Sequence, residues 1–153
     1  MPVIESQIDP QSEAFARNRT AMLAGVEHIR RLEQNLLDKA SEAKPKFDKR
    51  GQLLPRERLN LLLDPGAPFL ELASLAGYKL HDDKDGSSAG GGLIAGIGYV
   101  CGIRAMIVAN NSAIKGGTIS PSGLKKSLRL QQIARENKLP MITLAESGGA
   151  NLN

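Results

Sequence analysis

Two apolar segments joined by a short turn constrain the fold of this chain more than any other feature. Leu93–Tyr99 and Ile103–Asn110 are rich in isoleucine and valine, and the Cys101-Gly102 pair between them suits a tight turn. Runs of this length and composition are typical of β-strands. The sequence therefore predicts a β-hairpin over residues 93–110.

A helix and a third strand are expected after the hairpin. Ser120-Pro121 predicts a helix start, with serine as the N-cap and proline at the first helical position, and the helix extends to about Lys138. One side of this helix carries Leu124, Leu128 and Gln131. Met141–Ala145 then predicts a short, buried strand, and a turn over residues 146–150 follows it.

The order strand, strand, helix, strand indicates an α/β fold. Residues 103–145 form a β-α-β crossover, for which parallel strands and a right-handed connection are expected. The last strand would be an unpaired edge, because the sequence stops at Asn153, where the next helix should begin. We therefore expect the chain to continue in a longer protein.

The first half of the chain is charged and mostly helical. Start signals at Asp9-Pro10 and Ser12 predict one long helix over Ser12–Ala40, with a narrow apolar stripe that suits packing along the outside of a body or against a partner. The stripe follows a 4-3-4-3 spacing through Met22, Val26, Ile29, Glu33 and Leu36.

Shorter segments connect this helix to the hairpin. We expect a basic loop from Lys44 to Gly51, a short helix over Pro55–Leu63 that ends at Asp64-Pro65-Gly66, and a brief strand over Phe69–Leu75. The polar segment His81–Gly92 predicts a flexible loop with no core to bury. We divide the chain into an N-terminal helix with its basic loop, residues 1–50, and a second domain, residues 51–153.

Composition excludes several classes of protein. Apolar residues make up 41% and charged residues 24% of the 153, which is typical of a globular protein, and no apolar run approaches the roughly 20 residues of a membrane span. The net charge of +4 suits phosphate-bearing ligands better than nucleic acid, because the bases are scattered among acids and aromatics are only 3%. One cysteine and an acidic N-terminus without an apolar stretch predict a cytoplasmic location.

Two apparent motifs lack the structural context that their chemistry needs. Residues Gly86–Gly90 match G-x-S-x-G, but no strand precedes the serine and no helix follows it, so we expect a loop there. Residues Gly90–Ala95 resemble a dinucleotide fingerprint, yet they open a strand where the fingerprint must open a helix. His28, His81 and Cys101 lack partners at useful spacing, so no metal site is expected.

Two glycine-containing segments are the candidate sites. Lys115-Gly116-Gly117-Thr118 joins a strand to a helix, where a lysine, flexible backbone and a helix N-terminus suit an anion such as a phosphate or coenzyme A. Glu146-Ser147-Gly148-Gly149-Ala150 follows the last strand, where amides of Gly148 and Gly149 could face a carbonyl or enolate oxygen. Each segment also has a structural interpretation. Residues 115–118 could be a glycine turn that only joins a strand to a helix, and Glu146 could serve a structural role by bonding to nearby amides.

The chain resembles the carboxyltransferase (β) subunits of biotin-dependent acyl-CoA carboxylases. The resemblance runs through Arg50-Gly51-Gln52-Leu53-Leu54-Pro55-Arg56-Glu57-Arg58-Leu59 and Leu63-Asp64-Pro65-Gly66-Ala67-Pro68-Phe69-Leu70-Glu71. Residues 115–129 are similar to the branch acting on 3-methylcrotonyl-CoA and geranyl-CoA, and residues 146–150 match that family's (D/E)-S-G-G-A turn.

This resemblance implies the N-terminal part of a crotonase-like superhelix of ββα units, preceded by a long helix. It implies transfer of a carboxyl group from carboxybiotin, carried by a biotin carboxylase and carrier (α) partner, to an acyl-CoA, in a homo-oligomer of β subunits and without a metal. Gly148 and Gly149 would supply catalytic amides. Lys115, Gly116, Gly117, Thr118, Ser147 and Ala150 would bind the substrate. We expect the 153-residue chain alone to be inactive.

Two alternatives remain at this stage. The chain could belong to another crotonase-fold enzyme acting on coenzyme A esters, such as a hydratase or an isomerase. It could also be a non-catalytic binding or assembly module that associates through its first helix.

Overall fold

The computed structural model describes residues 5–80 and 83–149 of the chain, which divides into two compact units, Met1–Gln34 and Asn35–Asn153. Helix α1 (Glu13–Ser41) confirms the predicted long helix to within one residue at each end. Ser12 is its N-cap, because the amide of Phe15 donates to the Ser12 Oγ at 3.2 Å. None of the described helices has the length and apolarity that crossing a membrane requires.

The basic loop predicted from Lys44 to Gly51 is wrong in its first part, because a short helix forms there. Helix α2 (Lys44–Asp48) places Pro45 in its first turn, where a missing amide hydrogen costs nothing, and buries Phe47, which is 5% exposed. The loop was predicted because proline and clustered charges are common in loops. Burial of the one aromatic side chain in the segment favours the helix instead.

Helix α3 (Pro55–Leu62) confirms the predicted short helix. Proline occupies its first position, and the Glu57 carboxylate accepts a hydrogen bond from the Leu54 amide at 2.7 Å. Leu59, only 2% exposed, anchors the helix on the sheet below it.

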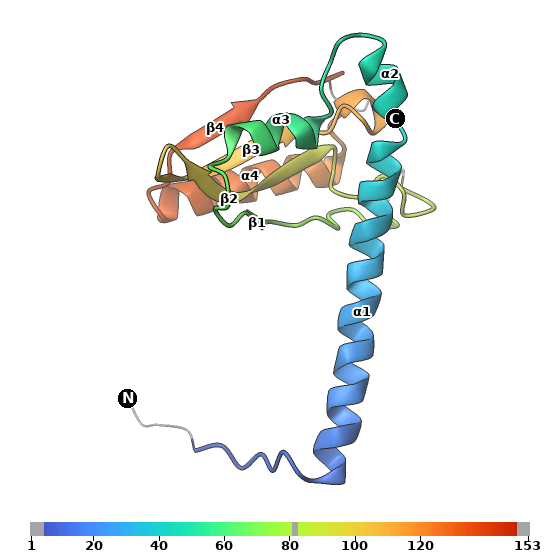
Figure 1. The fold of residues 1–153 in the computed structure, drawn as a ribbon, viewed down its shortest axis with the longest axis vertical. Coiled ribbons are helices and arrows are strands. Elements are labelled where there is room, and N and C mark those ends of the chain that lie inside the picture. Colours follow the sequence, from blue (N-terminus) through green and yellow to red (C-terminus); the bar gives the residue numbers. More distant parts are fainter. Residues whose placement is uncertain (1–4, 81–82, 150–153) are drawn as a thin grey trace. The chain divides into compact units, whose positions relative to one another are not determined.

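A four-stranded sheet forms the centre of the second unit, in the order β1-β2-β3-β4 (Figure 1). The strands are β1 (Leu70–Glu71), β2 (Leu93–Val100), β3 (Ile103–Asn110) and β4 (Met141–Leu144). β2 and β3 are antiparallel, and β3 and β4 are parallel, so the predicted hairpin and parallel pairing are both confirmed. β1 is shorter than the predicted strand at 69–75, because Ala73 has a φ of 51° and leaves the extended conformation.

The hairpin turn has the backbone that its sequence suggested. Cys101 and Gly102 have φ values of 51° and 75°, and two consecutive positive φ angles match the right-handed twist of the strands. The Asp64 carboxylate accepts both turn amides, each at 2.7 Å. Cys101 thus has a structural place, and its thiol is free and exposed.

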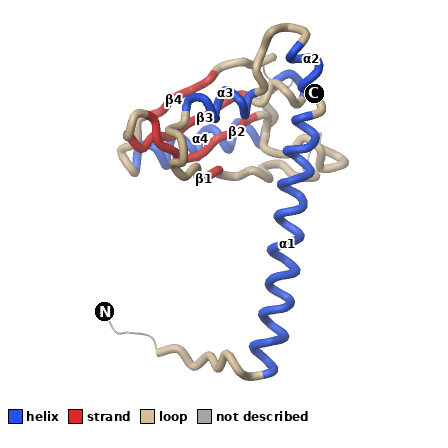
Figure 2. Tube along the Cα trace, in the orientation of Figure 1, coloured by secondary structure: helices blue, strands red, loops and turns tan. Residues whose placement is uncertain are grey.

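Helices α3 and α4 (Pro121–Glu136) cover opposite faces of the central strands (Figure 2). Alternate residues separate the two layers: Ala95, Met106 and Val108 belong to the cluster on the α4 side, and Ile94, Ala105 and Ile107 to the cluster on the α3 side. The helix start at Ser120-Pro121 is confirmed, since the Ser120 Oγ accepts the Gly123 amide at 3.1 Å.

The side of α4 that carries leucines in the sequence does not face the sheet. Leu124 and Leu128 are 58% and 57% exposed, whereas the buried positions of this helix are Gly123, Lys126, Leu130 and Ala134. A lysine, Lys126, therefore occupies one of the buried positions of this helix.

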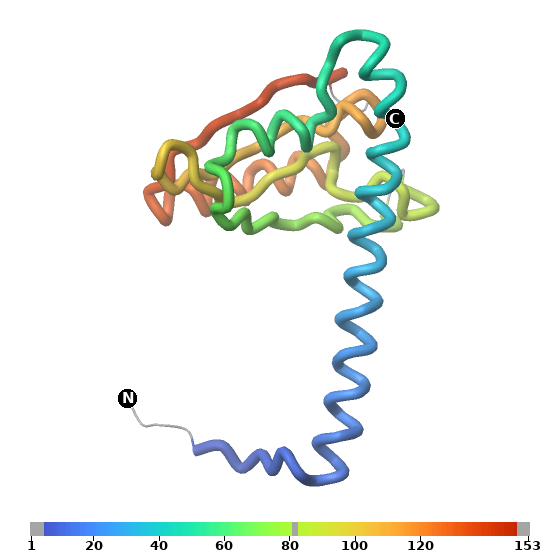
Figure 3. The backbone as a smooth tube through the Cα atoms, in the orientation of Figure 1, coloured from blue at the N-terminus to red at the C-terminus, as the bar shows by residue number. Residues whose placement is uncertain are grey.

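The predicted buried character of the last strand is also wrong. β4 alternates between exposed and half-buried residues, and Met141 is 39% exposed. The reason is its position at the edge of the sheet, beside β3, which can be followed in Figure 3.

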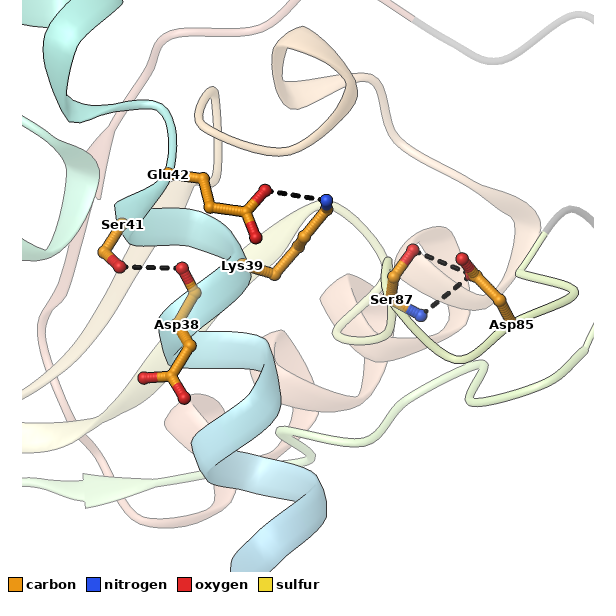
Figure 4. A network of polar contacts seen from close by, with 6 residues as sticks. All are labelled: Asp38, Lys39, Ser41, Glu42, Asp85 and Ser87. Atoms are coloured by element: carbon orange, nitrogen blue, oxygen red, sulfur yellow. Dashed lines mark hydrogen bonds and ion pairs between the residues drawn. The ribbon is translucent and has the colours of Figure 1, made fainter.

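The segment between β1 and β2 is better packed than the flexible loop that was predicted; His81 lies outside the described residues. Asp83 is 3% exposed and accepts hydrogen bonds from the Lys79 amide, the Ser88 amide and the Ser88 hydroxyl at 2.8–3.0 Å. Figure 4 shows that Ser87 donates to Asp85 through its amide and its hydroxyl. Both serines of the G-x-S-x-G pattern are thus donors to carboxylates within a loop, as expected of a non-catalytic segment.

Candidate functional site

A cleft of about 500 Å³ opens where β4 ends. Three stretches of chain form its walls: α2 with the residues beside it, the loop after β3, and the turn after β4. The lining residues are Ala43, Lys46, Phe47, Arg50, Ser112, Ala113, Lys115, Gly116, Glu146, Ser147 and Gly148.

The two candidate segments of the sequence meet at this cleft. The Gly148 amide donates to the Gly116 carbonyl at 3.0 Å, and the Ser147 hydroxyl donates to the Gly117 carbonyl at 3.2 Å. The Ile119 amide donates to the Gly149 carbonyl at 3.0 Å. Residues 116–119 and 147–149, which are far apart in the sequence, are therefore joined by three hydrogen bonds, two of them between backbone groups.

Glycine is required at Gly117 by this close approach. Its φ is 72°, and a Cβ atom there would lie 2.5 Å from the Glu146 carbonyl oxygen. Lys115 and Gly116 also have positive φ values, 46° and 63°, in a short 3₁₀ turn, η1 (Lys115–Gly117). The glycines therefore permit the contact between the two segments.

The predicted site residues divide into two groups. Lys115, Gly116, Ser147 and Gly148 line the cleft. Gly117, Thr118 and Gly149 are not among its lining residues but belong to the hydrogen-bonded framework behind it. Ala150 lies outside the described residues.

Both amides expected to bind an oxyanion already have acceptors within the chain. The Gly148 amide donates to a backbone carbonyl, and the Gly149 amide donates to the Ser147 Oγ at 3.0 Å. The start of the turn is held in the same way, because the Glu146 amide donates to the Oδ1 of buried Asn110 at 3.2 Å. An incoming oxygen would have to replace one of these acceptors.

The cleft is positively charged. Lys46, Arg50 and Lys115 line it, and Glu146 is the one carboxylate among the described lining residues. The charge of Glu146 is balanced by Arg58, whose Nη2 lies 2.5 Å from the Glu146 Oε2. The net positive charge suits an anionic ligand.

Sequence reasoning missed the α2 side of this cleft. Lys46, Phe47 and Arg50 were assigned to a basic loop without a function, although the clustering of lysine and arginine there was visible in the sequence. No sequence signal connected them with residues 146–148.

A smaller cavity of about 130 Å³ adjoins the cleft, and Ala113 lines both. Its wall is mostly apolar and includes Leu37, Leu54 and Pro55. The Oδ1 of Asn111, which also lines it, is buried and has no hydrogen-bond partner within the described part of the chain. This cavity therefore offers a mostly apolar surface, with Ser41, Arg56 and Asn111 as its polar lining residues.

Across residues 5–80 and 83–149, no group of three histidine, cysteine, aspartate or glutamate side chains is placed to hold a metal ion.

The three-layer α/β arrangement, with a glycine-rich site at the end of a parallel strand, defines a crotonase-like domain, and comparison with known proteins confirms this fold class. The chain is 72% identical to the β subunit of P. aeruginosa geranyl-CoA carboxylase over 99% of its length, with a TM-score of 0.89, and covers 28% of that chain. Residues 46–153 match the family described as the carboxyl transferase domain.

The chain belongs to this carboxyl transferase family, as the sequence resemblance indicated. It is 44% identical over 98% of its length to a probable mitochondrial methylcrotonoyl-CoA carboxylase β chain of Drosophila melanogaster, of which it covers 26%. It is 52% identical over 72% of its length to a biotin-dependent 3-methylcrotonyl-coenzyme A carboxylase β1 subunit of Mycobacterium tuberculosis, of which it covers 20%. The chain thus spans about a quarter of the length of the curated relatives it matches.

Proposed function

We propose that this chain is the acyl-CoA-binding part of a carboxyltransferase that moves a carboxyl group from carboxybiotin to an acyl-CoA of the 3-methylcrotonyl or geranyl type. The observation that carries the proposal is the cationic cleft beside the Glu146–Gly149 turn. The chain's relatives are carboxylase β chains, which favours carboxyl transfer over hydration or isomerisation.

The dimensions and charge of the cleft support coenzyme A as the ligand. Its phosphates would contact Lys46, Arg50 and Lys115, since lysine and arginine supply charge-assisted hydrogen bonds to phosphate oxygens. The adjoining cavity is mostly apolar and suits a flat, weakly polar part of the ligand, such as the adenine ring.

The thioester end of the substrate would lie toward the Ser147–Gly149 turn. The Gly149 amide is the easier of the two amides to use, because its present acceptor is a side-chain hydroxyl that can rotate away. The Gly148 amide is held by the Gly116 carbonyl, and its release would require movement of the backbone. An amide facing an enolate oxygen would stabilise the charge that develops as the carboxyl group is transferred.

The same proposal includes the partners. Carboxybiotin would arrive on a biotin carboxylase and carrier (α) subunit, and β subunits would form a homo-oligomer. Residues 51–153 would form the start of the acyl-CoA-binding domain, and residues 1–50 would form an N-terminal helical segment that precedes it. The cytoplasm is the expected location.

Titration of coenzyme A against the chain by calorimetry tests the cleft. We expect binding that weakens as salt is raised and that falls about tenfold in Lys115→Glu and in Lys46→Glu, because each variant removes one charge-assisted contact worth about 1.5 kcal/mol. Lys125→Glu is the matched control, since Lys125 is exposed on α4 and does not line the cleft.

Equal weakening in all three variants would show that binding depends only on net charge and would contradict the assignment of the cleft. No binding by the unaltered chain would favour the alternative of a non-catalytic assembly module.

A further inference from the structure

Three consecutive charged residues of α3 each pair with a different element. Arg56 makes a two-point contact with Glu71 of β1, with both N–O distances at 2.9 Å. The next two residues face the cleft walls: Glu57 lies 3.1 Å from the Lys44 Nζ at the start of α2, and Arg58 contacts Glu146 after β4.

Neither Glu57 nor Arg58 lines the cleft. Their ion-pair partners, however, stand at the start of two of the segments that form its walls. Lys44 opens α2, which presents Lys46 and Phe47 to the cleft, and Glu146 opens the turn that continues into Ser147 and Gly148. Both walls are short: one is the five-residue helix α2, and the other is the turn after β4.

Helix α3 is by contrast firmly placed. Pro55 and Leu59 are buried, and Leu59 belongs to the core cluster on that face of the sheet. Glu57 is fixed further by its hydrogen bond from the Leu54 amide, which is the largest cause of its lowered pKa, followed by its contact with Lys44. A rigid helix can therefore transmit its position to both walls through these two charges.

The Arg58 contact is a short charge pair with poor hydrogen-bond alignment. Its Nη2 lies 2.5 Å from the Glu146 Oε2, but neither Nη2 nor Nε of Arg58 makes an aligned hydrogen bond, although both atoms are buried. Removal of Arg58 would leave a partly buried Glu146 without a counter-charge, and the turn would move to hydrate it.

We propose that Glu57 and Arg58 are positioning residues that hold the two walls of the cleft from α3. This inference rests on the proposed function only in taking the cleft as the coenzyme A site.

Amide hydrogen exchange, measured by NMR on the chain without ligand, tests the Arg58 contact. In Arg58→Met we expect exchange at least about tenfold faster at the Gly148 and Ile119 amides, which join the turn to residues 116–119, and unchanged exchange at the Met106 amide in β3. Arg58→Lys keeps the charge and should restore most of the protection.

The matched control is Arg56→Met, which removes a similar ion pair from the same helix but on the β1 side. It should leave exchange at Gly148 unchanged, whereas Arg58→Met should speed that exchange and weaken coenzyme A affinity roughly tenfold. Equal effects of Arg56→Met and Arg58→Met on Gly148 exchange, or no effect of either, would overturn the role of Arg58.

Glu57→Gln tests the other wall. Glutamine retains an acceptor for the Leu54 amide but loses the charge that holds Lys44, so exchange of the Phe47 amide, which donates to the Ala43 carbonyl in α2, should become faster. Unchanged exchange there would refute the role of Glu57. If the unaltered chain fails to bind coenzyme A, the proposed function fails, while the exchange results still decide the positioning of both walls.

Discussion

Substitution of the buried Lys126 by methionine should remove a pH dependence from the stability of this protein. Lys126 is 5% exposed on the inner side of α4, and its ammonium group donates to the carbonyls of Leu93 at 2.8 Å and Gly90 at 3.3 Å. Burial is the main cause that lowers its pKa from 10.5 to about 8; Glu71 opposes this shift and Arg56 adds to it.

The sign of the effect follows from proton binding. Between pH 8 and pH 10.5, Lys126 is protonated in the unfolded chain and largely neutral in the folded one, so unfolding takes up a proton. The free energy of unfolding therefore rises with pH across this window. A pKa difference between 10.5 and about 8 corresponds to about 3 kcal/mol of stability that is missing at pH 7 and regained near pH 10.5.

Lys126→Met keeps the length of the aliphatic stem but has no proton to exchange. At pH 7 the two proteins should differ little, because the variant loses two hydrogen bonds but also avoids burying a charge. By pH 10.5 the unaltered protein should be the more stable of the two by a margin about 3 kcal/mol larger than at pH 7.

Urea unfolding of both proteins at intervals from pH 7 to pH 10.5 measures this margin. Contributions that the two proteins share cancel in the difference. A margin that stays constant across the range would refute the reasoning, since it would mean that Lys126 has an ordinary pKa in the folded state.

Substitutions at four further positions have expected outcomes in thermal or urea unfolding. Gly123→Ala should cost about 3 kcal/mol or lead to misfolding, because the new methyl group would overlap the Gly91 carbonyl, whereas Gly25→Ala, with open space around it in α1, should stabilise its helix by up to about 1 kcal/mol. Asp64→Ala should cost about 2 kcal/mol, since both amides of the hairpin turn lose a charged acceptor; an unchanged midpoint would show that water replaces it fully. Ser120→Ala should cost about 1 kcal/mol as an N-cap loss, and Ser120→Thr should retain most of the stability.

Much of the second unit could be predicted because its signals are local. The hairpin follows from two apolar runs around Cys101-Gly102, and the start of α4 from Ser120-Pro121, where cap and first turn lie within three residues. The two candidate segments were also found in the sequence, because adjacent glycines after a strand are conspicuous. Their meeting through Gly116 and Gly148 could not be predicted, since it depends on the parallel placement of β3 and β4.

Errors arose where burial outweighed local preference. Residues 44–48 looked like a basic loop, but the burial of Phe47 makes them a helix that forms one wall of the cleft. The sequence grouped Leu124 and Leu128 on one side of α4, and this side is exposed, whereas Lys126 is buried. The ammonium group of Lys126 donates to the Gly90 and Leu93 carbonyls, and these hydrogen bonds favour a lysine at that place.

The sequence by itself determined most elements of this protein, α2 excepted, and the family that it resembles, because turns, caps and apolar periodicity act within a few residues. Only the tertiary structure decided how the site is built. The placement of α2 at the cleft, the Arg58–Glu146 pair and the occupied amide of Gly148 all depend on contacts between segments far apart in the chain. Such contacts are set by which surfaces pack together, and packing is a property of the folded chain.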